Sequence, residues 1–359
     1  MNNHSVEIKK DRQNKLYSFI QSKRMGPFVW TVALLVLLAV LIVSLTACGM
    51  ARPLENEPGE SGKNGKAGQG QAGGVAGSKW QEEPDITLYM HETEETKEMP
   101  LEEYLLGVVA AEMDPTWPAA ALEAQAILAR TFTLERIESL GGVPKRGTDA
   151  STDVEEFQAY DAGRINDSVK KAVENTRGKV ATWQGRLIKA WFFADGGGKT
   201  AASALEGLAY DKEETPYIHS VEDPGAAITE ESNKQWSVAI PVAEARERLK
   251  SFTGNDPGEI SSAKILEKGE SGRATKVQIG SLTTGGPAMR LALGSTEVKS
   301  ALLTKLAVEG GKLVVAGKGY GHGVGMSQWG ARAMAEEGKS GQEIVGYFFK
   351  DVEIEQLYE

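Results

Sequence analysis

Residues 101–113 read LEEYLLGVVAAEM, and residues 118–137 read PAAALEAQAILARTFTLERI. The first run carries apolar residues at helical spacing, and Asp114-Pro115 ends it because the residue before a proline avoids helical backbone angles. The second run begins near Pro118, since proline is favoured at the start of a helix, and continues to about Ile137. Two consecutive helices rich in alanine can pack closely, so the fold is expected to be built around them.

The rest of the chain mixes strand and helix signals. Strands are predicted at 86–90, 180–183, 187–193, 263–266, 276–279 and 313–315, and closing helices at 327–337 and 341–349. The pattern has no βαβ alternation and no internal repeat, which predicts the α+β class. We expect one mixed domain over residues 84–359, with helices around β-sheet.

The N-terminus predicts a membrane anchor. Residues 28–48 are almost wholly apolar and, at about 1.5 Å per residue, can cross a hydrocarbon core of roughly 30 Å. Lysines and arginines in residues 1–27 favour a cytoplasmic location for this N-terminal segment. We therefore expect a single-pass protein of the cell membrane, with the residues after 48 on the outer side. Leu45-Thr46-Ala47-Cys48 leaves a second interpretation open, in which Cys48 becomes a lipidated N-terminus after cleavage.

Composition and charge exclude several other kinds of structure and function. Residues 49–83 are rich in Gly, Ser, Ala and Glu and predict a flexible linker. The net charge of −10 argues against a general nucleic-acid surface. One cysteine allows no intrachain disulfide, and four scattered histidines exclude a Cys/His zinc site of ordinary spacing. No cofactor is expected.

Glu112 is the strongest candidate for acid/base chemistry. It ends an apolar helix among small residues, so a substrate chain could approach it. The negative end of the helix dipole and partial burial would both raise the pKa of its carboxyl, as a general acid at neutral pH requires. The alternative is a solvent-facing glutamate.

Two polar residues in the following helix are unusual among its alanines. Gln125 and Arg130 could hydrogen-bond sugar groups or orient Glu112, while Glu123 shares a helix face with Arg130. A structural ion pair is the alternative for Arg130.

A glycine-rich stretch follows a predicted strand, and residues 317–331 read GKGYGHGVGMSQWGA. Glycines let the backbone approach a ligand, but the Gly-Lys-Ser/Thr ending of a phosphate loop is missing. Tyr320, His322, Ser327 and Gln328 instead offer aromatic stacking and neutral hydrogen bonds suited to carbohydrate. The alternative for this stretch is a purely structural turn. Asp195, which precedes three glycines, is a second candidate carboxylate, but for that segment a tight turn is the favoured interpretation.

These motifs together resemble the SpoIID family, the stage II sporulation protein D group of peptidoglycan lytic transglycosylases. The resemblance runs in family order through residues 104–113, 123–126, 129–131, 197–200, 216–217, 221–224, 271–273 and 319–331.

The resemblance implies that Glu112 cleaves MurNAc–GlcNAc bonds in peptide-stripped glycan strands and leaves 1,6-anhydro ends. Glu112 would protonate the glycosidic oxygen and then accept the proton of the C6 hydroxyl as that oxygen attacks C1. It also implies action at the mother-cell membrane during engulfment, with stage II sporulation proteins P and M as partners.

The chain departs from the family in two places. Residues 149–160 read DASTDVEEFQAY and lack the Cys and His of the zinc-binding loop of some members, so no zinc is expected. Asp195 replaces the serine-like residue before the Gly-Gly-x-Thr turn. Two competing hypotheses remain: a non-catalytic wall-binding enhancer of an amidase, and a hydrolase that pairs Glu112 with Asp114 or Asp195.

Overall fold

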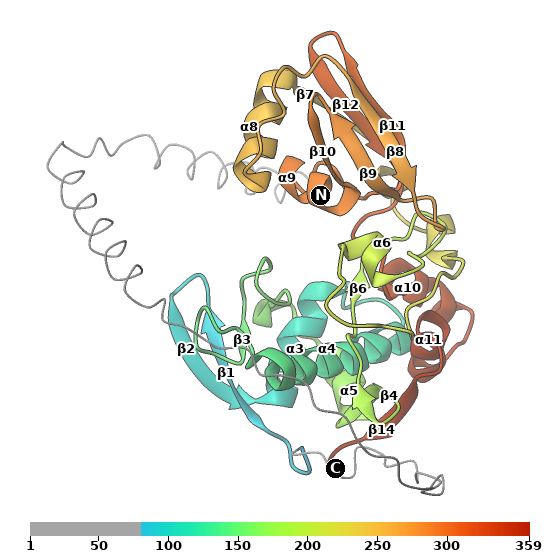
Figure 1. Cartoon of the computed structure of the whole chain (residues 1–359). Coiled ribbons are helices and arrows are strands. Elements are labelled where there is room, and N and C mark those ends of the chain that lie inside the picture. The colour runs from blue at the N-terminus through green and yellow to red at the C-terminus, as the bar shows by residue number, and fades with distance from the viewer. Residues whose placement is uncertain (1–79) are drawn as a thin grey trace, which may run out of the picture. The chain divides into compact units, whose positions relative to one another are not determined.

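The computed structural model describes residues 80–359, and these combine helices with several small sheets (Figure 1). The predicted α+β class is confirmed. The predicted anchor at 28–48 and nearly all of the predicted linker lie outside the described residues. Within residues 80–359, no helix has the length and apolar character needed to cross a membrane.

The first half of the described chain forms a small sheet and the helices that follow it. The sheet has the order β2-β1-β3, with β1 (Asp85–Met90), β2 (Glu95–Pro100) and β3 (Ala150–Ser151). The helices are α3 (Leu101–Glu112), α4 (Ala119–Leu140), η2 (Ala162–Arg164) and α5 (Asp167–Asn175).

Helix α4 is the centre of this part. It packs against α3, α5, the strand β4 (Lys179–Trp183) and the C-terminal helices α10 (Gln328–Glu336) and α11 (Gly341–Phe348) (Figure 1). Its alanines Ala121, Ala124, Ala126 and Ala129 are fully buried, because a methyl side chain lets neighbouring backbones come close. Gly141, in the left-handed conformation, ends the helix.

Short strands and helices complete the same core. Strand β4 lies between β14 (Glu353–Gln356) and β5 (Arg186–Leu187), while β6 (Phe192–Phe193) runs parallel to β13 (Met326–Ser327). The remaining elements are α6 (Ala204–Leu208), η3 (Pro224–Ala227) and α7 (Glu231–Lys234).

Residues 236–317 have a hydrophobic core of their own. They form a sheet of order β11-β12-β7, a second sheet of order β10-β9-β8 and two helices. The elements are β7 (Trp236–Pro241), α8 (Val242–Thr253), β8 (Ala263–Lys268), β9 (Ala274–Ile279), β10 (Leu282–Gly285), α9 (Gly286–Leu293), β11 (Leu303–Glu309) and β12 (Lys312–Gly317). Trp236 is the first residue of this region and Gly317 is the last, and the two are paired opposite each other on β7 and β12.

One predicted strand is divided. The sequence predicts a strand over 187–193, but only its two ends are strands, β5 and β6. The chain changes partners between them: Leu187 pairs with β4, whereas Phe192 pairs with β13. A single ladder cannot serve both partners, so the segment between them leaves the strand conformation.

Candidate active site

Glu112 is the last residue of α3, and its side chain is partly buried. Met113 then adopts an extended conformation, which turns the chain away before Pro115. Most of the other α3 side chains enter the main hydrophobic core. The helix therefore presents one carboxyl group at the edge of a rigid, apolar element.

Both oxygens of the Glu112 carboxyl receive hydrogen bonds from distant parts of the chain. The backbone N–H of Ala159 donates to Oε1 at 2.8 Å, and Gln328 Nε2 donates to Oε2 at 3.3 Å. Gln328 Nε2 also lies 3.4 Å from Gln125 Oε1. The end of α3, the segment before η2, α4 and α10 thus meet at this carboxyl, with neutral amides around it.

Burial raises the pKa of Glu112 above its ordinary value, while the hydrogen bonds from Ala159 and Gln328 oppose that rise by stabilising the carboxylate. The balance favours the protonated acid more than in a solvent-exposed glutamate. A carboxyl group that keeps its proton nearer to neutral pH is suited to general acid catalysis.

The segment that carries Ala159 is fixed against α3. Gly107 O accepts a hydrogen bond from Asp161 N at 3.0 Å, and a Cβ on Gly107 would meet the Tyr160 ring at 2.2 Å. Gln158 Nε2 donates to Thr133 Oγ1 at 2.9 Å. Gly107 therefore permits the close approach that brings the Ala159 N–H to Glu112.

The loop before this segment is stabilised by ion pairs. Arg146 binds both carboxylate oxygens of Glu156, with its Nε at 2.9 Å from one and its Nη2 at 2.8 Å from the other. Lys145 Nζ lies 2.7 Å from Glu156 Oε1, and Ser151 Oγ donates to Oε2 at 3.1 Å. This is the stretch in which the sequence lacks zinc ligands; the absence of zinc remains a prediction.

An aromatic pair lies beside the same elements. Trp117 precedes α4, Trp329 directly follows Gln328, and their ring centroids are 4.9 Å apart. The Arg332 guanidinium lies over both rings, at 5.3 and 5.1 Å from their centroids. The two rings are tilted by 57° to each other. All three side chains are partly exposed, so they form an aromatic surface next to the residues that hold Glu112.

Arg130 does not fit its predicted role in substrate binding. Its side chain is fully buried, with Nε and Nη2 bound to the two oxygens of Glu102 at 2.7 and 2.6 Å. Nη1 donates to Lys179 O at 2.9 Å, and Tyr358 Oη donates to Glu102 Oε1 at 2.7 Å. The guanidinium is committed to joining α4 to α3 and β4, so the ion-pair alternative describes it.

Gln125 and Ser327, also predicted to bind substrate, are fully buried and hold neighbouring parts of the protein in place. Gln125 is fully buried and contacts Gln328, so it can orient the amide that reaches Glu112. Ser327 is fully buried and caps α10, accepting a hydrogen bond from Gly330 N at 3.1 Å. Sugar contact by either residue is not supported by these positions.

Tyr320 and His322 make their contacts in the glycine-rich loop. The Tyr320 backbone exchanges hydrogen bonds with Asp195, and Lys299 lies over its ring. The His322 ring lies 5.5 Å from the Phe193 ring, and its Nδ1 accepts from Val324 N. Burial lowers the pKa of His322 to about 3, so it is neutral at physiological pH. Substrate roles for both remain predictions.

Several motifs distant in sequence meet at residues 196–200. Arg273 donates to the carbonyls of Lys199 and Gly196 at 2.8 and 3.0 Å, and Asp223 accepts from Gly196 N. A Cβ on Gly323 would meet the Arg273 guanidinium at 2.3 Å. These residues stabilise the glycine-rich turn and the loop that follows β12. This structural role accounts for their place among the motifs that resemble the family, and it requires no part in catalysis.

The sequence reasoning missed the residues that surround Glu112 through backbone or aromatic contacts. Ala159 contributes only its N–H, which no side-chain pattern can reveal. Gly107 gave a usable signal, because a glycine inside a helix often marks a place where another part of the chain packs closely. That part is Tyr160. Trp117 and Trp329 were visible as rare aromatic residues beside Pro118 and Gln328.

The fold and site define an α+β protein in which the partly buried carboxyl group of Glu112 is held between neutral amides. Residues 89–183 match the family described as stage II sporulation protein (SpoIID), and residues 218–325 match a domain of unknown function, DUF8618. The chain is similar to stage II sporulation protein D of Bacillus subtilis, with 30% identity over 76% of this chain and 79% of that protein. The corresponding protein of Bacillus amyloliquefaciens is 29% identical over 76% of this chain and 78% of its own length.

The chain belongs to the SpoIID family. A protein named amidase enhancer from Bacillus subtilis is also similar, with 29% identity over 68% of this chain but only 39% of that protein. Membership supports a function in sporulation connected with the cell wall.

Proposed function

We propose that this protein is a peptidoglycan lytic transglycosylase in which Glu112 is the only catalytic acid/base. The observation that carries the proposal is a carboxyl group whose pKa is raised by burial while two neutral N–H donors fix its position. The resemblance supplies the substrate: MurNAc–GlcNAc bonds in glycan strands from which the peptides have been removed.

One carboxyl group is sufficient for this reaction. Glu112 first donates its proton to the glycosidic oxygen, which leaves as a hydroxyl. As the C6 hydroxyl of the same sugar attacks C1, its proton passes to the Glu112 carboxylate, so the enzyme returns to its starting state. No water is consumed, and the paired carboxylates of glycoside hydrolases are not required.

The two aspartates of the hydrolase hypothesis are engaged elsewhere. The Asp114 carboxylate accepts from the backbone N–H and the hydroxyl of Thr116, and these bonds lower its pKa. Asp195 is buried, with Oδ1 bound to Gly197 N, and burial raises the pKa of its carboxyl. The contacts of Asp114 favour a reaction with Glu112 alone over one that pairs Glu112 with Asp114.

The same proposal includes the location and partners. An anchor at 28–48, followed by the linker, would hold residues 84–359 outside the mother-cell membrane, and stage II sporulation proteins P and M would act beside it. Mass analysis of the mature protein tests the anchor, because a lipidated Cys48 at the N-terminus would show the lipoprotein form instead.

The catalytic proposal is tested with peptide-stripped glycan strands and the full chain. Glu112→Gln should lower the rate of anhydro-product formation by at least about a hundredfold, because the general acid is lost. Glu103→Gln, at an exposed position on the same helix, is the matched control and should keep full activity. Mass spectrometry distinguishes anhydro ends from reducing ends, and reducing ends would indicate the hydrolase.

The similarity to an amidase enhancer favours a second candidate, a wall-binding protein without activity of its own. It predicts no products from the wild-type chain, together with a partner amidase that releases stem peptides faster in its presence. Under that hypothesis Glu112→Gln would leave the stimulation unchanged.

A further inference from the structure

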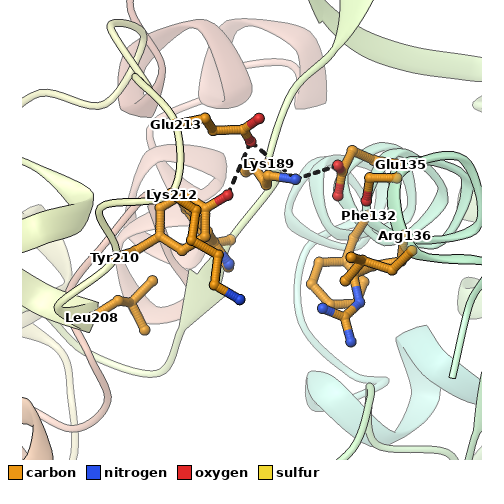
Figure 2. A pocket seen from close by; sticks show the side chains of 11 residues that line it. Phe132, Glu135, Arg136, Lys189, Leu208, Tyr210, Lys212 and Glu213 are labelled. Atoms are coloured by element: carbon orange, nitrogen blue, oxygen red, sulfur yellow. Dashed lines mark hydrogen bonds and ion pairs between the residues drawn. The ribbon is translucent and has the colours of Figure 1, made fainter. Parts of the chain in front are cut away.

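A cavity of about 450 Å³ opens beside the second half of α4 (Figure 2). Phe132 and Arg136 of α4 line one side, and Tyr210 and Lys212 line the opposite side; Trp191 also borders the cavity. This volume is within the range of ligand sites, and the lining combines aromatic rings with cations.

The two glutamates that line this cavity share one lysine. Lys189 binds both Glu135 and Glu213, the latter at 3.0 Å, and Tyr210 Oη donates to Glu213 at 3.1 Å. Figure 2 shows this chain of contacts running between the two sides of the cavity. Within residues 80–359, the ion pairs of both glutamates go to Lys189 and not to Arg136 or Lys212.

Among the described residues that line the cavity, Arg136 and Lys212 are the cations without an ion pair. The Arg136 guanidinium lies 5.9 Å from the ring centroids of Phe132 and Phe157, and its Nε is hidden from solvent with no hydrogen-bond partner in this part of the chain. A partly buried guanidinium with an unused donor is costly unless a ligand satisfies it. Arg130, six residues earlier on α4, is by contrast paired with both oxygens of Glu102.

The cavity continues the line of the candidate active site. Phe132 and Arg136 follow Gln125 by seven and eleven residues, which places them on the same face of α4, with Arg136 roughly 16 Å further along the helix. The segment 157–159 links the two places directly: the Phe157 ring packs on Phe132 at 5.2 Å, and Ala159 N donates to Glu112. Gln125 and Ala129 on this face are fully buried, so the segment 157–159 is the connection between the two places, and the cavity lies within reach of a glycan strand bound at Glu112.

We propose that this cavity is a subsite for a carboxylate carried on a sugar of the glycan strand, bound by the Arg136 guanidinium with help from Lys212. The inference rests on the proposed function. Removal of a stem peptide leaves a free carboxylate on the lactyl ether of each muramic sugar, whereas an intact peptide turns that group into a neutral, bulky amide. A planar guanidinium matches a carboxylate with two parallel hydrogen bonds, and the aromatic walls suit sugar rings. The cavity thus selects strands that have lost their peptides.

Equilibrium binding tests the subsite without requiring catalysis. The full chain with Glu112→Gln is titrated with glycan oligosaccharides that carry free lactyl carboxylates, and with the same oligosaccharides after conversion to methylamides. We expect about tenfold or greater preference for the free acids, the amount a charge-assisted hydrogen-bond pair contributes. Adding Arg136→Gln should remove the preference, while Arg186→Gln, at an exposed arginine outside the cavity, should keep it. Arg136→Lys should retain only part of it.

A preference that survives Arg136→Gln, or no preference in the Glu112→Gln parent, would overturn the subsite. Cleavage by chains with native Glu112 separates this result from the catalytic proposal. Anhydro products from both substrates at equal rates would reject the subsite and keep the enzyme. Selective binding without any product would reject the enzyme and keep the subsite. Thermal unfolding of Arg136→Gln close to wild type shows that the variant folds.

Discussion

Gln328 Nε2 lies 3.3 Å from Glu112 Oε2, although 216 residues separate them in the chain. The donor is the first residue of α10, and its other neighbour is the buried Gln125 Oε1. Gln328 therefore holds the carboxyl in one orientation without adding a charge. That arrangement makes the protonation of Glu112 sensitive to a neutral neighbour.

Removal of the Gln328 amide should change the pH profile of the proposed reaction. The amide stabilises the Glu112 carboxylate, so Gln328→Leu should raise the already elevated pKa of Glu112 further. The alkaline fall of kcat/KM should then move to higher pH, while kcat decreases because the carboxyl is less well oriented. Gln342→Leu, exposed on α11, is the control. An unshifted alkaline limb would mean that another group controls it.

Glu112 should lower the unfolding free energy of the protein at neutral pH. A carboxyl whose pKa is raised in the folded state contributes most stability below its unfolded pKa, and that contribution is lost as pH rises through the folded pKa. Glu112→Gln should therefore stabilise the protein at pH 7, on the order of 1 kcal/mol, and the gain should shrink towards pH 4. Urea unfolding at both pH values measures this, with the exposed Glu103→Gln showing no such trend.

A methyl group at Gly107 should separate Ala159 from Glu112. Its Cβ would overlap the Tyr160 ring, so Gly107→Ala should cost about 1–3 kcal/mol in unfolding free energy and reduce activity. Gly346→Ala on α11 has nothing within 4 Å and should stabilise the protein by about 0.5–1 kcal/mol. Equal behaviour of the two variants would show that close packing at Gly107 is unimportant.

Loss of Arg130 should destabilise the fold without a specific effect on substrate affinity. Burial alone would raise the pKa of Glu102, but its contacts with Arg130 and Tyr358 hold that pKa below the usual value. Arg130→Ala leaves this charge buried and unpaired, which should cost about 3–5 kcal/mol. Denaturant unfolding measures the loss against the exposed Arg186→Ala. A raised KM in a variant of normal stability would restore the substrate-binding interpretation.

The sequence predicted the elements whose signals are local. The helices ending at Glu112 and beginning after Pro118 are confirmed, because apolar spacing and prolines define them before any tertiary contact forms. Strand β1 and helix α11 are confirmed for the same reason. The divided strand after Leu187 could not be predicted, since the change of pairing partner depends on β13, more than 130 residues later.

The site shows the same division. Glu112 could be selected from its helix and its small neighbours, and Gln328 from its motif. The N–H of Ala159 and the buried pairing of Arg130 depend on contacts across 47 and 28 residues, respectively. Side-chain type suggests chemistry, whereas availability for chemistry depends on packing.

The pairing of Trp236 with Gly317 means that the region between them starts and finishes at neighbouring points on two adjacent strands. A segment attached in this way can be acquired, exchanged or lost in evolution while the polypeptide on either side stays joined. The helices around Glu112 and the region 236–317 can therefore diverge at different rates, and relatives that share the helices around Glu112 need not share the region 236–317.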